Sequence, residues 1–179
     1  MRSFTPTLVG VQDKIIKEEE MKEGTKSVLF GCHSFIHSFY VLKAWTILHK
    51  EWPNWWQIIC IMIHDIGYLG KNYLSNKEEY KMHWFLGARL AGELFGKKGF
   101  DFVASHTKNP WVPLDPKFKA ADRFSWVIAS DYWLNWNKWV EKYITPAKEW
   151  KKICLEGMKD LTKANYELYL EIEGNKKDM

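Results

Sequence analysis

Residues 55–67 read Trp-Trp-Gln-Ile-Ile-Cys-Ile-Met-Ile-His-Asp-Ile-Gly, and this stretch decides the fold. From Trp55 to Ile66 the sequence is apolar almost all round a helical wheel, which is typical of a helix at the centre of a domain. A buried strand is the alternative reading, but strand-type neighbours with turn signals are absent elsewhere. We therefore predict a central buried helix, broken by Gly67 and Gly70.

Helical patterns also precede this segment. Residues 9–23 predict a charged amphipathic helix that ends at Gly24, and residues 28–50 predict a helix with apolar side chains at a 3.6-residue period. Pro53 then restarts the chain, because proline suits the first turn of a helix.

Further helices are expected after the central one. Ser75-Asn76-Lys77-Glu78 has the form of a capping box and predicts a helix from there to about Phe95. Three prolines exclude regular structure from the loop over residues 109–116. The other predicted helices cover about residues 99–107 and, as two or three helices, residues 117–144 and 146–173. Because no segment alternates as a strand does, we predict an all-α fold, with one helical-bundle domain over residues 1–173 and a polar tail over 174–179.

The composition agrees with one globular domain. The chain has 179 residues, within the range of about 100–200 that is usual for a domain. The net charge of +4 comes without a block of basic residues, so extended nucleic acid is not an expected partner. The longest apolar run, Ile58–Ile63, is far shorter than the roughly 18 residues of a membrane span, and the N-terminus has no signal-peptide pattern. We expect a cytoplasmic protein with no membrane partner.

The 11 tryptophans are the unusual feature of the composition. Four of them follow helical spacing, at Trp126, Trp133, Trp136 and Trp139. They predict core packing or a subunit interface, so the sequence leaves a homo-oligomer open.

His64 and Asp65 stand at the end of the apolar central segment. An imidazole and a carboxylate are costly to bury without partners, and a metal ion removes that cost because it binds both directly. If the helix over 28–50 and the central helix are antiparallel, the two arms that meet at Pro53 bring His37 level with His64. Three further candidate ligands follow on later helices: His83, His106 and Asp122.

This ordered set resembles the HD-domain superfamily of metal-dependent phosphohydrolases. The resemblance covers about residues 30–130 and implies an HD-type helical bundle. The stretches that carry it are His37-Ser38-x-x-Val41, His64-Asp65-Ile66-Gly67, His83-x-x-x-Gly87-Ala88 and Ala121-Asp122-Arg123.

The resemblance also implies a pair of metal ions. One ion would bind His37, His64, Asp65 and Asp122, and the other would bind His83 and His106, with Asp65 and a water or hydroxide as bridges. Imidazole and carboxylate ligands without thiolate favour Fe or Mn, and Zn, Co or Ni also fit.

The implied activity is hydrolysis of a small phosphorylated substrate, either a nucleotide or another phosphate ester or diester, by the metal-bridging hydroxide. Asp65 would take part in catalysis. Lys108 and Arg123 would balance the charge of the substrate, and Lys71 and Arg89 are further basic candidates. Two other functions stay open: an HD-fold diiron oxygenase and a non-catalytic ligand-binding HD domain.

His33 is an alternative to His37 as the first ligand. It lies one turn earlier on the same predicted helix and is also followed by serine. We prefer His37 because Val41, Ala44 and Leu48 then fall into the core register. Tyr68 stands where some mononuclear nucleotidases of the superfamily carry Glu, so that subgroup is not favoured; Tyr68 is also a candidate to reach the site.

Overall fold

The computed structural model describes residues 23–73, 76–107, 115–141 and 146–158. Every regular element within these ranges is a helix, so the predicted all-α fold is confirmed. In chain order the elements are α2 (Glu23–Phe30), α3 (Phe35–His49), α4 (Trp55–Ile63), the 3-10 helix η1 (Ile66–Tyr68), α5 (Lys77–Lys81), α6 (Trp84–Phe95), α7 (Lys97–Ala104), α8 (Pro116–Ile128), α9 (Asp131–Glu141) and α10 (Ala147–Met158). The predicted helix over 9–23 (except Glu23) and the tail over 174–179 lie outside the described residues.

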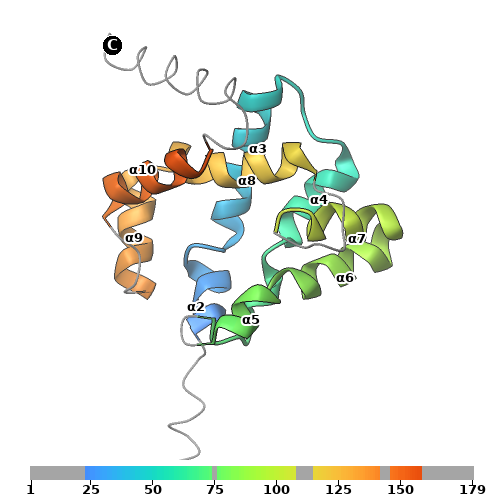
Figure 1. Cartoon of the computed structure of the whole chain (residues 1–179), viewed down its shortest axis with the longest axis horizontal. Helices are drawn as coiled ribbons and strands as arrows, with labels where there is room; N and C mark the ends of the chain where they lie inside the picture. The colour runs from blue at the N-terminus through green and yellow to red at the C-terminus, as the bar shows by residue number, and fades with distance from the viewer. Residues whose placement is uncertain (1–22, 74–75, 108–114, 142–145, 159–179) are drawn as a thin grey trace, which may run out of the picture.

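Helices α3 and α8 pack against each other through the middle of the molecule (Figure 1). The α6–α7 pair lies on one side of them, and α9 and α10 lie on the other. α4 contacts α3, α6 and α7, whereas α10 packs on α8. The central segment therefore joins α3 to the α6–α7 pair.

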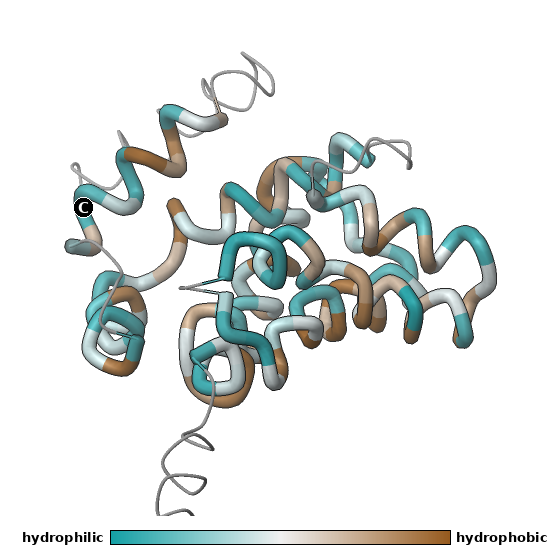
Figure 2. The backbone as a smooth tube through the Cα atoms, turned by 60° about the horizontal axis from the view of Figure 1, so that its bottom comes forward, coloured by the Kyte–Doolittle hydropathy of each residue, from teal (hydrophilic) through white to brown (hydrophobic). Residues whose placement is uncertain are grey.

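Hydrophobic and hydrophilic positions alternate along the helices, which is typical of helices that each bury one face (Figure 2). The main core is formed by α3, α4, α6, α7, α8 and the end of α10. A smaller core surrounds Trp126 and Trp133. Of the four tryptophans at helical spacing, Trp126 and Trp133 are thus buried, whereas Trp136 and Trp139 are 41% and 72% exposed.

The prediction that the central helix is wholly buried is wrong. α4 buries Cys60 and Ile61 completely, but Trp55 and Ile59 on its other face are exposed. Its start is fixed by Asn54, whose side chain and that of Gln57 form a reciprocal capping box. No helix in the described ranges is both long and apolar enough to cross a bilayer.

The helix predicted over 28–50 is interrupted. α2 ends at Phe30 and α3 begins at Phe35, with a turn in which the amide of Gly31 donates to the carbonyl of Lys26 at 3.0 Å. A Cβ atom on Gly31 would lie 1.8 Å from Oε1 of Glu141, so the turn depends on a residue without a side chain. Gly24, predicted to end a helix, lies inside α2.

The helix predicted over 75–95 is also two helices, α5 and α6. Asn76 caps α5, because its side-chain oxygen accepts from the amides of Glu78 and Glu79 at 3.1 and 3.2 Å. The predicted cap, Ser75, lies outside the described residues. The break between the two helices falls at Met82 and His83, which puts this histidine at the start of α6.

Candidate metal centre

The structure brings all six predicted ligands together. His37 lies on α3 and Asp122 on α8, whereas the other four lie at helix ends: His64 and Asp65 between α4 and η1, His83 before α6, and His106 after α7. Nε2 of His37 lies 3.0 Å from Oδ1 of Asp122 and 3.6 Å from Oδ2 of Asp65. The side chains fall into groups that are able to hold a metal ion, among them His37–His64–Asp122 and Asp65–His83–His106.

The two oxygens of Asp65 face different histidines. Oδ2 lies 3.2 Å from Nε2 of His64, whereas Oδ1 lies 3.8 Å from Nε2 of His83 and 3.7 Å from Nε2 of His106. Asp65 is 5% exposed and stands between the two groups. Its carboxylate is therefore placed to bridge two ions.

Hydrogen bonds fix the orientation of the imidazoles. Nδ1 of each of three histidines donates to the carbonyl three residues earlier: His64 to Ile61 at 2.6 Å, His83 to Tyr80 at 2.6 Å and His106 to Val103 at 2.5 Å. With Nδ1 bonded to a carbonyl, Nε2 of each ring points into the centre, as in histidines that bind metals.

His37 is oriented by a serine. Its Nδ1 lies 3.3 Å from Oγ of Ser125, and that hydroxyl donates its own hydrogen to the carbonyl of Asp122 at 2.5 Å. Oγ of Ser125 therefore accepts from Nδ1 of His37, and Nε2 is again left for the centre. Ser125 was not predicted as a site residue. The one feature of the sequence that points to it is its place one turn after Asp122 on the same helix.

These nitrogens fit a metal ion. Nε2 of His64 is buried and makes no well-aligned hydrogen bond among the described residues, although Oδ2 of Asp65 lies 3.2 Å away. Nε2 of His83 lies 3.2 Å from Nε2 of His106 although Nδ1 of each already carries the proton. Two ligands at right angles on one ion, each about 2.1 Å from it, are about 3.0 Å apart. Cations would satisfy all three nitrogens.

Burial and charge set the protonation of the centre. Burial lowers the pKa of His106 to about 3, helped by His64 and His83, and burial also lowers the pKa of His37 and His83. Burial alone would lower the pKa of His64, but Asp65 and Asp122 outweigh it and raise that pKa to about 10. Burial would raise the pKa of both carboxyls, yet the imidazoles that face them hold each pKa well below its usual range.

Two glycines of the motif stretches allow backbones to approach closely. A Cβ atom on Gly67 would lie 1.5 Å from the carbonyl oxygen of His83, and one on Gly87 would lie 2.6 Å from that of His64. The two glycines thus allow the segment that carries His64 to pack closely against the segment that carries His83. Ala88, next to Gly87, and Ala121, next to Asp122, are fully buried.

Aromatic rings line the centre. The ring of Tyr68 lies between two histidines, stacked on His33 with centroids 4.0 Å apart and on His83 with centroids 4.4 Å apart. Trp126 stacks on His37 at 4.6 Å. Phe118 contacts His64 and His106 edge-on or tilted. Sequence reasoning had considered Tyr68 but assigned no site role to Trp126 or Phe118.

His33 also reaches the centre. Its Nδ1 lies 2.6 Å from Oδ2 of Asp65, and its side chain is 17% exposed, against 1% for His37. Both histidines weighed as the first ligand therefore reach Oδ2 of Asp65. His37 faces His64 and Asp122, while His33 belongs to a separate group with His37 and Asp65.

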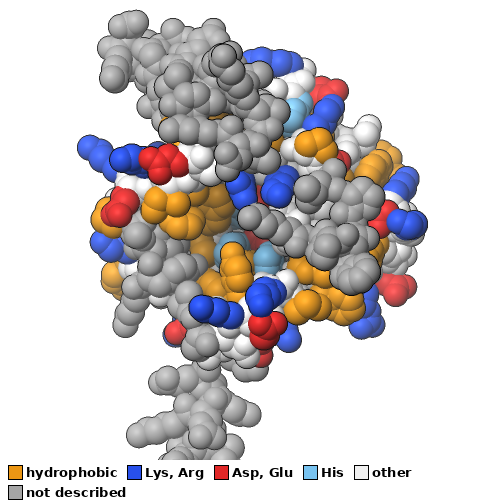
Figure 3. Space-filling model, in the orientation of Figure 1, with side chains coloured by type: hydrophobic (Ala, Val, Ile, Leu, Met, Phe, Trp, Pro, Cys, Tyr) orange, Lys and Arg blue, Asp and Glu red, His pale blue; other side chains and the backbone are white. Residues whose placement is uncertain are grey.

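The predicted basic residues are less clearly connected to the centre. Lys108 lies outside the described residues. Arg123 is half-buried and donates Nη1 to the carbonyl of Gly157 on α10 at 2.8 Å, and Lys71 and Arg89 are exposed. Even so, histidine side chains lie in a hollow of the surface that has lysine or arginine side chains beside it (Figure 3).

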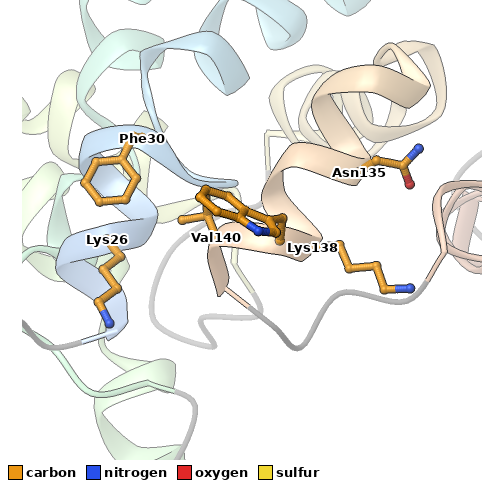
Figure 4. Close-up of a pocket in the computed structure, with 6 residues that line it drawn as sticks. Lys26, Phe30, Asn135, Lys138 and Val140 are labelled. Atoms are coloured by element: carbon orange, nitrogen blue, oxygen red, sulfur yellow. The ribbon is translucent and has the colours of Figure 1, made fainter.

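A pocket between α2 and α9 is separate from this centre (Figure 4). It is lined by Lys26, Phe30, Asn135, Lys138, Trp139 and Val140. None of the candidate ligands lines it, so the candidate chemistry lies at the buried cluster.

Comparisons with known proteins give no relative for the chain: no family model, no curated protein and no solved structure matches it.

Proposed function

We propose that this protein is a metal-dependent hydrolase of small phosphate esters or diesters, with a two-ion centre of the HD type. The observation that carries the proposal is the set of histidine Nε2 atoms that converge on Asp65 and Asp122. His83 and His106 present two such atoms 3.2 Å apart, and Nε2 of His64 is buried against Oδ2 of Asp65 without a well-aligned hydrogen bond among the described residues. Buried imidazoles in this arrangement are poorly explained without cations.

Each residue has a defined part in the proposal. His37, His64 and Asp122 would hold one ion, His83 and His106 the other, and Asp65 would bridge them. Bound divalent ions supply Lewis acidity, which polarises a phosphoryl oxygen and lowers the pKa of a water. The basic side chains beside the hollow in Figure 3 would attract an anionic substrate. Stacking on Tyr68 and Trp126 would hold the imidazoles in place.

The proposal is tested by metal analysis and hydrolysis together. We expect protein purified without added metal to hold up to two transition-metal ions per chain. With Mn or Fe it should release phosphate or an aryl alcohol from aryl phosphate esters, aryl diesters or a nucleotide panel. Asp65→Ala should abolish both metal binding and hydrolysis. Asp101→Ala, which only breaks a surface ion pair with Lys97, should change neither.

Other outcomes would replace this function. Oxygen uptake after anaerobic Fe(II) loading, without hydrolysis of the panel, would indicate the diiron oxygenase that the same ligand set suits. Protein that binds no transition metal would leave only the non-catalytic reading.

A further inference from the structure

His33 makes the shortest of the described contacts to the bridging carboxylate. Nδ1 of His33 lies 2.6 Å from Oδ2 of Asp65, against 3.2 Å for Nε2 of His64. A carboxylate that binds metal ions carries no proton, so in the two-ion centre it accepts and Nδ1 of His33 donates. A nitrogen whose proton points at the carboxylate has no lone pair on that side for a metal ion.

That hydrogen bond acts on one of the two carboxylate oxygens. Oδ2, held by His33, is turned toward His37 and His64, which leaves Oδ1 facing His83 and His106 at 3.7–3.8 Å. A carboxylate without this restraint is free to rotate and to offer both oxygens to one ion. The contact of His33 therefore favours the arrangement in which Asp65 serves two ions.

His33 is itself held on two sides. Its ring stacks on Tyr68, and Tyr68 stacks in turn on His83. The turn that carries His33 is fixed from α9, because the buried carboxylate of Glu141 accepts from the amide and the thiol of Cys32 at 2.6 and 3.0 Å. A residue fixed by stacking and by its own backbone is suited to orient another side chain.

We propose that His33 is a positioning residue for the two-ion centre: by donating to Oδ2 of Asp65 it keeps Oδ1 available to the ion at His83 and His106. The inference rests on the proposed function, since it assumes two ions. It resolves the choice between His33 and His37 by giving them different tasks. His37 binds an ion directly, whereas His33 acts through Asp65.

The test compares three variants at His33 by chelator-competition titration of metal-free protein with Mn²⁺ and by metal analysis. In His33→Ala the second ion should bind about 10–100-fold more weakly, the usual effect of removing a group that orients a ligand. His33→Asn should retain near wild-type affinity, because its amide nitrogen stands as many bonds from the backbone as Nδ1. His33→Gln, whose amide matches Nε2 instead, should behave like His33→Ala. Melting curves of the metal-free variants establish that all three fold.

A double variant separates positioning from ligation. His83→Ala alone should leave one ion, and adding His33→Ala should not weaken that remaining ion. A further loss in the double variant would make His33 a ligand of the first ion and overturn the inference. Equal affinity for both ions in wild type and His33→Ala would also overturn it while leaving the proposed function intact. Wild-type protein that binds no ion would overturn both.

Discussion

Nε2 of His83 and Nε2 of His106 face each other at 3.2 Å, and Nδ1 of each ring already donates a hydrogen bond to a backbone carbonyl. Two lone pairs at this separation repel unless a cation lies near both. The rings are held there by different segments, His83 before α6 and His106 after α7, so the pair depends on how these two helices pack.

Removing one member of this pair should empty one metal position. In His83→Ala we expect the metal content to fall from two ions per chain to about one, because His106 and one oxygen of Asp65 form too small a ligand set. Metal analysis of the purified protein measures this. His49→Ala is the matched control, because His49 is remote from the ligands and contacts the carbonyl of Lys117. Two ions in His83→Ala would contradict the assignment.

Ser125→Ala should weaken the other position. The hydroxyl of Ser125 accepts from Nδ1 of His37, and without it that ring loses the partner that keeps Nε2 free. We expect the affinity for the ion at His37 to fall about 10–100-fold, as is usual for such a partner. Competition titration with a coloured chelator measures it.

Ser105→Ala is the control for this substitution. Ser105 is equally buried and donates to the carbonyl of Phe102. It precedes His106 in the chain, so its loss bears on the ion at His83 and His106, and its hydroxyl makes no described contact with His37. The two serine variants lose similar buried hydrogen bonds, so a difference in metal affinity between them reports the His37 contact. Equal metal affinities in Ser125→Ala and Ser105→Ala would mean that Ser125 does not orient His37.

The sequence predicted which side chains converge better than it predicted the helices that carry them. His64 and Asp65 stand out because they end an apolar segment, and the order of the other histidines adds to that signal. The break at Gly31 is not readable in this way, because the helical pattern continues through it. The turn there is fixed by Glu141, which lies 109 positions after Cys32 in the chain and accepts a hydrogen bond from the Cys32 amide.

The contact of His33 with Asp65 could not be predicted from the sequence either. Spacing places His33 and His37 on one face of a continuous helix, as rival ligands. In the structure a turn precedes α3, and His33 lies in that turn while His37 lies in the helix. With this backbone change both side chains reach Oδ2 of Asp65, Nδ1 of His33 at 2.6 Å and Nε2 of His37 at 3.6 Å.

Gly67→Ala should disturb the centre through the backbone. The new Cβ would meet the carbonyl oxygen of His83 at 1.5 Å, so η1 and the start of α6 must move apart. We expect a loss of at least about 1–3 kcal/mol in the free energy of unfolding, the usual cost of overpacking, together with loss of the ion at His83. Thermal or denaturant unfolding of the metal-free protein and metal analysis measure the two effects.

Gly92→Ala provides the control within α6. A Cβ there would make only ordinary contacts, the nearest at 3.4 Å to Phe100. Since alanine favours a helix over glycine by up to about 1 kcal/mol, Gly92→Ala should be neutral or stabilising and should keep both ions. If Gly67→Ala were as stable as Gly92→Ala, the close approach of Gly67 to the backbone of His83 would not contribute to stability.

Metal binding should release a proton from His64. Asp65 and Asp122 overcome the effect of burial and raise the pKa of His64 to about 10, so the metal-free imidazole is protonated at neutral pH. An ion that binds Nε2 must displace this proton, and its affinity should therefore rise with pH up to about pH 10. His106, whose pKa lies at about 3, is already neutral and contributes no proton.

This expectation is measured by adding Mn²⁺ to metal-free protein at pH 8 in a weakly buffered solution with an indicator dye. At least one proton per chain should appear, and His83→Ala should release it as well, because that variant keeps the position at His64. An affinity independent of pH between 6.5 and 8.5 would mean that His64 is neutral before metal binds. In that case the two carboxylates would not hold its proton, and the charge balance derived for the centre would be wrong.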